Sequence, residues 1–197
     1  MKNVIKNTKK GFLMVTMFAT LLSFATEPAN LTVVKDAKKT IVTLDSVKKG
    51  NLLTIIDQNG IVLYKEVIAK TGNYQKSFDL TALPDGKYVF ELEKDLEIDT
   101  MPFTVTNNLV TFDKASEKVT YKPFVRVENS VVFVSKLSLN ESPLKVEIYY
   151  GQDSNLVFSE SIENTKNIQK AYKLAGLGEG NYRFVFTTEG KTFTEQI

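Results

Sequence analysis

An internal repeat constrains the fold of this chain more than any other sequence feature. The second half repeats the apolar, glycine and tyrosine positions of the first at an offset of 94 residues, which pairs Phe78 with Tyr172, Gly86 with Gly180, and Tyr88 with Tyr182. Agreement of these residue types over about 30 positions indicates a duplicated structural unit. The sequence therefore predicts two similar units of roughly 80 residues, each large enough for a small hydrophobic core.

The residue pattern inside each unit is typical of β-strands. Short runs rich in Val, Ile, Phe, Tyr and Thr, such as Ile41–Leu44 and Leu52–Ile56, alternate with Gly, Asn and Asp. Asn59-Gly60 favours a tight hairpin turn between two such runs. No segment after residue 25 has the 3.6-residue apolar period of a helix. We therefore predict an all-β chain in which each unit folds as a β-sandwich or a barrel.

The boundary between the two units is expected where the strand pattern is interrupted. Asn107-Asn108 and the polar run Asp113–Lys118 follow the last strand-like segment of the first unit. The predicted domains are accordingly residues 26–106 and residues 107–197.

The N-terminal 25 residues have the features of an export signal. Four lysines precede Gly11–Leu22, an uncharged apolar run, and Ser23-Phe24-Ala25 places small residues where a signal peptidase cleaves. The apolar run is shorter than the ~20 residues that span a membrane. The sequence predicts a signal peptide over residues 1–25 and a secreted mature chain, in the periplasm, at the cell surface or outside the cell. No later segment is long enough to form a membrane span.

Charge and composition exclude several classes of function. Removing the four signal lysines leaves 25 − 4 = 21 basic against 23 acidic residues, a net charge of −2, so the mature surface has no electrostatic attraction for nucleic acid. The chain has no His and no Cys, which removes the commonest general base, thiolate nucleophiles, disulfides and the usual zinc ligands. We therefore expect a non-enzymatic protein with no cofactor and no metal site.

The best local motif occurs once in each unit. Leu83-Pro84-Asp85-Gly86-Lys87-Tyr88 and Leu177-Gly178-Glu179-Gly180-Asn181-Tyr182 both combine a leucine, a glycine-containing turn and a tyrosine that opens a strand. This arrangement is typical of a tyrosine corner, in which the phenol hydroxyl bonds to backbone. We assign a structural rather than a ligand-binding role to six residues: Leu83, Gly86, Tyr88, Leu177, Gly180 and Tyr182.

Acidic residues at alternate positions form a second candidate feature. Placed on one extended strand, they would share one face, opposite Leu92, Leu96 and Ile98. Such a row can be interpreted as a cation site, but carboxylates along one strand are about 6–7 Å apart and do not converge. A solvated face or a protected sheet edge is the favoured interpretation. The row consists of Glu91, Glu93, Asp95, Glu97 and Asp99.

Two further groups of residues have both a functional and a structural interpretation. An aromatic platform for sugars could be built from Tyr64, Tyr74, Tyr149, Tyr150 and Phe158. Ordinary sheet packing is favoured because Tyr149 and Tyr150 point to opposite faces of a strand and the chain has no Trp. Ser135-Lys136 would allow Ser–Lys catalysis, but the favoured interpretation places it on a strand facing solvent.

The segment Leu53–Leu92 resembles a known family of secretion domains. Its Asp-x-x-Gly hairpin, the Phe-Asp-Leu run at residues 78–80 and the motif ending at Tyr88 are similar to the C-terminal sorting domain of type IX secretion cargo, and Lys145–Phe186 resembles the same domain more loosely. The resemblance implies two tandem immunoglobulin-like (Greek-key) antiparallel β-sandwiches. It also implies a Gram-negative bacterium as the source and the secretion machinery as a partner. The chain departs from the family in its terminal residues, Phe193–Ile197, which lack a basic tail.

Three functional hypotheses follow, in order of preference. The first is a secreted, non-catalytic binding or structural module of the bacterial envelope or cell surface, which contacts a protein or glycan partner through loops or by β-augmentation of a sheet edge. The second is a type IX secretion substrate whose C-terminal sandwich is the sorting signal. The third is an atypical hydrolase without His or Cys.

Overall fold

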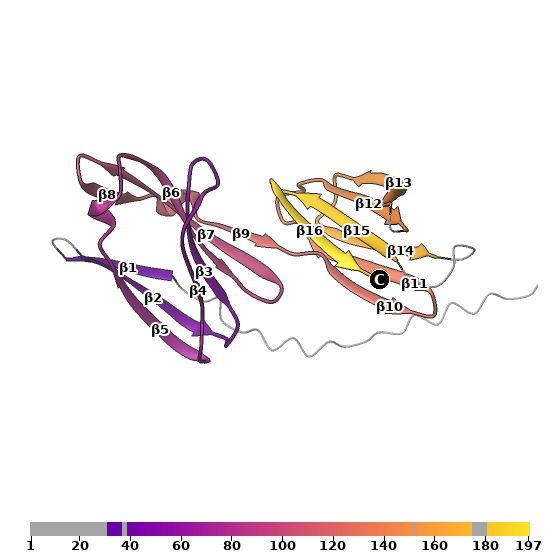
Figure 1. The fold of residues 1–197 in the computed structure, drawn as a ribbon, viewed down its shortest axis with the longest axis horizontal. Coiled ribbons are helices and arrows are strands. Elements are labelled where there is room, and N and C mark those ends of the chain that lie inside the picture. Colours follow the sequence, from indigo (N-terminus) through magenta and orange to yellow (C-terminus); the bar gives the residue numbers. More distant parts are fainter. Residues whose placement is uncertain (1–30, 37–38, 152, 175–180) are drawn as a thin grey trace, which may run out of the picture.

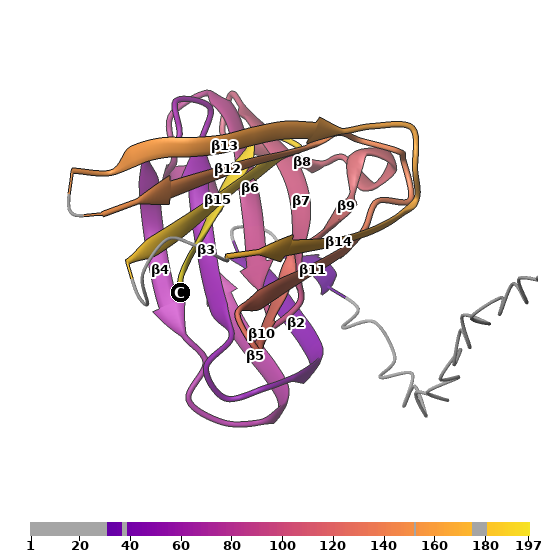
Figure 2. The same ribbon diagram turned by 90° about the vertical axis from the view of Figure 1, so that its right-hand side faces the viewer.

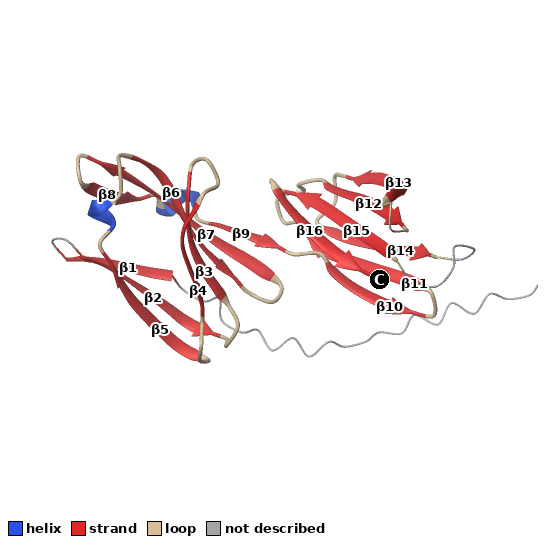
Figure 3. Ribbon diagram, in the orientation of Figure 1, coloured by secondary structure: helices blue, strands red, loops and turns tan. Residues whose placement is uncertain are grey.

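The computed structural model describes residues 31–36, 39–151, 153–174 and 181–197. The predicted signal peptide, residues 1–25, lies outside these ranges, as do Leu177 and Gly180 of the second predicted corner. The described chain is built from antiparallel strands, with two single-turn 3₁₀ segments, η1 (Leu80–Ala82) and η2 (Lys114–Ser116) (Figure 3). The predicted all-β fold class is therefore confirmed.

The first sandwich packs a three-stranded sheet against a larger one (Figure 1). The smaller sheet has the order β1-β2-β5: β1 (Leu31–Asp36), β2 (Lys39–Val47) and β5 (Gly72–Phe78). The larger sheet has the order β4-β3-β6-β7-β8: β4 (Val62–Val67), β3 (Leu52–Asp57), β6 (Gly86–Glu93), β7 (Glu97–Thr106) and β8 (Leu109–Phe112). A further strand, β9 (Lys118–Tyr121), also pairs with β7.

The second sandwich repeats this arrangement, but its described strands include no counterpart of β8 and β9. Its smaller sheet has the order β10-β11-β14: β10 (Phe124–Glu128), β11 (Val131–Leu137) and β14 (Asn167–Lys173). Its larger sheet has the order β13-β12-β15-β16: β13 (Asn155–Ile162), β12 (Leu144–Tyr150), β15 (Tyr182–Thr188) and β16 (Lys191–Gln196). The four strands β13-β12-β15-β16 correspond to β4-β3-β6-β7, as the 94-residue offset predicts.

Each sandwich has its own hydrophobic core, because alternate side chains of each strand face the opposite sheet. In the first core the buried residues include Leu44 and the pair Phe90 and Phe103, whose ring centroids are 5.2 Å apart. In the second core they include Phe184 and Phe186, both without exposed surface. The two clusters of buried residues are separate.

The turn predicted at Asn59-Gly60 is confirmed. Gly60 adopts a φ of +83°, which a glycine accommodates at no steric cost. The Asp57 carboxylate accepts backbone hydrogen bonds from Asn59 and Ile61, at 2.9 and 2.8 Å. These bonds close the hairpin between β3 and β4.

Strands β8 and β9 belong to the first sandwich, whereas the sequence prediction assigned them to residues 107–197. β8 pairs with Phe103–Thr106 and β9 pairs with Glu97–Thr100, so the two short strands lie along the same edge of β7. The predicted boundary after Thr106 falls inside the β7–β8 hairpin. The chain leaves the first sandwich only after Tyr121 and enters β10 at Phe124.

The two sandwiches meet through equivalent ends (Figure 1). Because β9 runs antiparallel to β7 and pairs Tyr121 with Glu97, it returns the chain to the end of the first sandwich that carries the β6–β7 turn. The equivalent β15–β16 turn of the second sandwich faces this end. Viewed from the right-hand side of Figure 1, the strands of the second sandwich cross those of the first at a steep angle (Figure 2).

Candidate functional site

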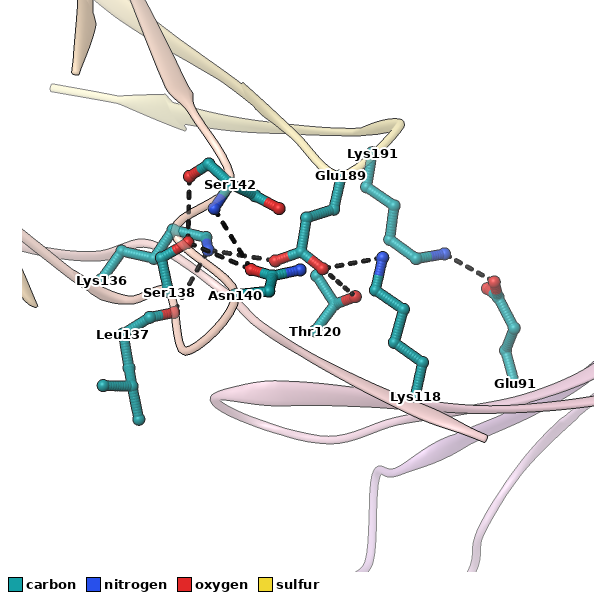
Figure 4. A network of polar contacts seen from close by, with 10 residues as sticks. All are labelled: Glu91, Lys118, Thr120, Lys136, Leu137, Ser138, Asn140, Ser142, Glu189 and Lys191. Atoms are coloured by element: carbon teal, nitrogen blue, oxygen red, sulfur yellow. Dashed lines mark hydrogen bonds and ion pairs between the residues drawn. The ribbon is translucent and has the colours of Figure 1, made fainter. Parts of the chain in front are cut away.

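The junction between the sandwiches is organised around the β15–β16 hairpin. Its two-residue turn, Glu189-Gly190, has positive φ at both positions, +52° and +76°, and Thr188 pairs with Lys191 across it. This is the geometry of a tight hairpin turn whose twist matches the flanking strands. The turn directs the Glu189 side chain toward the last strand of the first sandwich (Figure 4).

Glu189 is the central residue of the junction. Its side chain is 4% exposed, and its carboxylate oxygens lie 2.8 Å from the Lys118 ammonium and 3.3 Å from that of Lys136. The Thr120 hydroxyl donates to the same carboxylate at 3.3 Å. Lys118 and Thr120 belong to β9, so this carboxylate joins the two sandwiches. Burial raises the pKa of Glu189, but the two lysines together lower it by more than burial raises it. The pKa of Glu189 therefore lies below its ordinary value.

Lys136 was expected to face solvent, and that prediction is wrong. Its side chain has no exposed surface, and its ammonium bonds to Glu189 and to the carbonyl of Leu137, at 3.3 and 3.2 Å. The neighbouring strand residues explain the orientation: Val132 and Val134 are buried, and Lys136 continues their alternation. A buried ammonium needs such partners, because an unpaired charge is costly to desolvate.

Three further contacts lie at the junction and its linker. The Lys191 ammonium of the second sandwich lies 2.5 Å from a Glu91 oxygen of the first (Figure 4). The connection between the sandwiches, Lys122-Pro123, is only two residues long. Lys122 donates its backbone N–H to the Leu96 carbonyl and its ammonium to Glu93, both at 2.8 Å. Proline restricts the backbone at the second linker position.

The predicted acidic row does not lie on one strand. The chain reverses at Lys94–Leu96, so Glu91 and Glu93 end β6, whereas Glu97 and Asp99 begin the antiparallel β7. Leu96 consequently lies in the turn, 57% exposed, rather than on an apolar face. The physical reason is that Lys94 neutralises Glu97 and Asp99, at 2.8 and 2.6 Å, and so stabilises the reversal.

Each acid of this row has a lysine partner. The remaining pairs are Glu91 with Lys191, Glu93 with Lys122, and Asp95 with Lys48. Within the described ranges, no cluster of three or more acidic side chains is placed to hold a metal ion. The acids instead contribute to the turn and to the interdomain junction.

The first predicted corner is described at Leu83, Gly86 and Tyr88. The buried Tyr88 donates its hydroxyl to the Pro84 carbonyl at 2.7 Å, and Leu83 packs against the first core. Gly86 begins β6 with a φ outside the left-handed region, and an added Cβ would lie 3.5 Å from the Tyr88 hydroxyl. Neither a positive φ nor a close contact therefore requires glycine at this position.

The second corner is described only at Tyr182. Its ring is buried, with its centroid 4.9 Å from that of Tyr150. Its backbone exchanges two hydrogen bonds with Ile197, at 2.8 and 3.2 Å. The structural roles assigned to the corner residues, including Leu177 and Gly180, stay predictions.

The aromatic residues considered as a sugar platform are not brought together. Tyr64 and Tyr74 lie on the first sandwich, whereas Tyr149, Tyr150 and Phe158 lie on the second. Tyr150 packs against the second core, and the Arg183 guanidinium lies over the Tyr149 ring at 4.4 Å. The two adjacent tyrosines thus point to opposite faces of β12, as the strand geometry requires.

Equivalent glutamates connect the edge strands of the two sheets, β4 with β5 in the first sandwich and β13 with β14 in the second. Sequence reasoning missed this feature. Glu66 contacts Tyr64 and, at 2.5 Å, the ammonium of Lys76. In the second sandwich, Glu160 accepts hydrogen bonds from Lys170 and Tyr172, at 2.8 and 2.7 Å. The offset of 94 pairs both the glutamates and the lysines, but the tyrosine hydroxyl has moved to the opposite strand. A search for charged pairs at the repeat offset would have found this cluster.

Comparisons with known proteins identify no family. No protein family matches this chain, and no curated protein is significantly similar to it. One solved structure with some likeness is a tetra-tandem repeat in the extending region of a large adhesion protein. It is 14% identical, with a TM-score of 0.27, over 85% of this chain and 47% of that chain. The chain thus spans about half the length of that structure, and a likeness at this level carries no argument about fold or function.

None of the described residues forms an apolar helix of membrane-spanning length.

Proposed function

We propose that this chain is a secreted, non-catalytic structural and binding module whose two sandwiches form one rigid unit. The observation that carries the proposal is the buried Glu189 carboxylate, which bonds to Lys136 of its own sandwich and to Lys118 of the other. The carboxylate contacts both Lys118 and Thr120 of the first sandwich, and these two bonds favour the one interdomain geometry in which both form. The missing His and Cys residues further support a non-catalytic role.

A rigid unit makes a direct prediction for the full chain in solution. We expect residual dipolar couplings from both sandwiches to fit a single alignment tensor. The double variant Lys118→Met/Glu91→Gln removes both interdomain ion pairs from the side of the first sandwich and leaves Lys136 paired with Glu189. Its couplings are expected to require two different tensors.

A matched control has the same change in charge. Lys87→Met/Glu117→Gln alters two exposed residues of the first sandwich and is expected to keep the single tensor. A wild-type chain whose sandwiches already align independently would contradict the rigid-unit proposal.

The resemblance to sorting domains supports a second proposal, in which the second sandwich directs export. Because the second sandwich has a separate hydrophobic core, we expect that it can be removed without unfolding the first sandwich. Truncation after Tyr121 in the producing cell is then expected to abolish release while the first sandwich stays folded. Fractionation with intact-mass measurement distinguishes the outcomes, because a released truncated chain would exclude a sorting role.

A further inference from the structure

The edge strands of the two sandwiches are not equally protected against pairing with another chain. An exposed sheet edge presents free N–H and C=O groups, which proteins shield with charged side chains, prolines or short strands. Among the described strands, β8 and β9 are four residues long, and β1, β4, β5, β10, β14 and β16 each carry Lys or Arg. β13 is the longest edge strand, at eight residues, and has neither Lys, Arg nor Pro.

The side chains of β13 are unusually apolar for a sheet edge. Leu156, Val157 and Phe158 are 53, 45 and 43% exposed. The one charged residue of the strand, Glu160, is held by Lys170 and Tyr172 of β14. β13 bulges at Val157, because Ile148 pairs with Phe158 and Tyr149 with Leu156. Beyond the bulge, Phe158–Ile162 pairs with β12 without a further shift of register.

A groove of about 440 Å³ opens beside this edge, between β13 and β14. Its apolar lining includes Val157, Phe158 and Leu174, and the ring of Tyr172 lies 5.8 Å from that of Phe158. A strand added to β13 would extend the larger sheet and place alternate side chains over this groove. The groove is thus positioned to receive a side chain of the added strand.

The charge around the groove favours an acidic ligand. Glu160 and Lys170 neutralise each other at 2.8 Å. Lys173, which also lines the groove, is exposed and has no ion pair within the described part of the chain. One ammonium therefore remains to bind a carboxylate.

A second copy of this chain fits the edge less well. Antiparallel pairing of Phe158–Ile162 with itself places Glu160 opposite Glu160, and like charges directly opposite each other destabilise a strand pair. A single added strand also buries less surface than the ~1,200 Å² of a stable interface. A short peptide segment suits this edge better than a dimer does.

We propose that β13 binds an extended segment of another protein by strand addition, with a bulky apolar side chain in the β13–β14 groove and a carboxylate at Lys173. This site does not depend on the rigidity of the interdomain junction. Backbone hydrogen bonds along the edge supply affinity, and the groove and the lysine select the sequence.

Synthetic peptides test this proposal on the full ¹⁵N-labelled chain. The probe has eight residues, the length of β13, alternates leucine with threonine and carries one aspartate. We expect saturable amide shifts in β13 and β14 at peptide concentrations up to about 1 mM. A peptide with lysine in place of the aspartate is expected to bind about tenfold more weakly, because it repels Lys173. A peptide with a central proline is expected not to bind, since it lacks a backbone donor.

The chain offers a matched pair of variants at equivalent bulges. Val157→Asp places a charge on the proposed edge, whereas Leu63→Asp makes the same change at the corresponding position of β4. Val157→Asp is expected to weaken binding of the aspartate peptide at least about tenfold. Leu63→Asp is expected to leave that binding unchanged. Lys173→Glu is expected to reverse the preference between the aspartate and lysine peptides.

Several results would overturn the proposal. These are the absence of β13 shifts with the aspartate peptide, equal loss of binding in the two edge variants, and a peptide preference unaffected by Lys173→Glu. Concentration-dependent shifts of β13 without any peptide would identify a second copy of the chain as the occupant instead.

Discussion

Phe184→Ala is expected to destabilise the second sandwich by about 3–5 kcal/mol while the first sandwich stays folded. The Phe184 ring has no exposed surface, and its centroid lies 5.8 Å from that of Tyr172 and 6.1 Å from that of Phe186. Its removal therefore leaves a cavity between the two sheets that the neighbouring rings cannot fill without leaving their packed positions. The loss is local because the hydrophobic cores of the two sandwiches are separate.

Amide hydrogen exchange of the full chain measures this effect in each sandwich separately. Core amides of β12 and β15 are expected to lose protection in the Phe184→Ala variant, while those of β3 and β6 keep it. The matched variant is Phe90→Ala, at the equivalent position of the first sandwich, and is expected to give the reverse pattern. Equal loss of protection in both sandwiches from either variant would mean that the chain folds as a single cooperative unit.

The sequence predicted the sandwiches because local signals and the repeat agree. Alternating apolar residues define the strands, Asn59-Gly60 defines a turn, and the 94-residue offset carries the strand order from one unit to the other. The strand and turn signals depend on nearby residues, and the repeat is found by aligning the two halves of the sequence. None of them requires knowledge of the tertiary contacts.

The domain boundary could not be predicted in the same way. β8 and β9 are each four residues long and separated by the polar residues around η2, so they resemble a linker in the sequence. Their pairing with β7 is a tertiary contact, and only this pairing returns the chain to the end of the sandwich that carries the β6–β7 turn.

The charged residues of the junction were misread for a similar reason. Lys136 looks like an ordinary surface lysine until the β15–β16 turn brings Glu189 to it, 53 residues later in the chain. The acids from Glu91 to Asp99 look like one row because alternation continues across Lys94–Leu96, where the chain reverses. Composition and period locate charges on faces, but they do not identify partners that lie far away in the sequence.

Glu189→Ala is expected to lower the stability of the second sandwich by about 3 kcal/mol, because it leaves Lys136 buried without its carboxylate partner. The Lys136 side chain has no exposed surface, and its remaining contact is the Leu137 carbonyl. The double variant Lys136→Met/Glu189→Ala removes the unpaired charge and is expected to recover most of the loss. Urea denaturation of the four chains of this cycle measures the coupling directly.

The pH dependence gives an independent measure of the same pair. Because the folded pKa of Glu189 lies below its ordinary value of 4.5, its contribution is fully present above that value and is lost as the pH falls through the folded pKa. Between neutral pH and this acidic range, the stability difference between wild type and Glu189→Ala is expected to shrink. A difference that stays constant down to the lowest pH at which both chains fold would contradict ionisation of Glu189 as the source of the junction's stability.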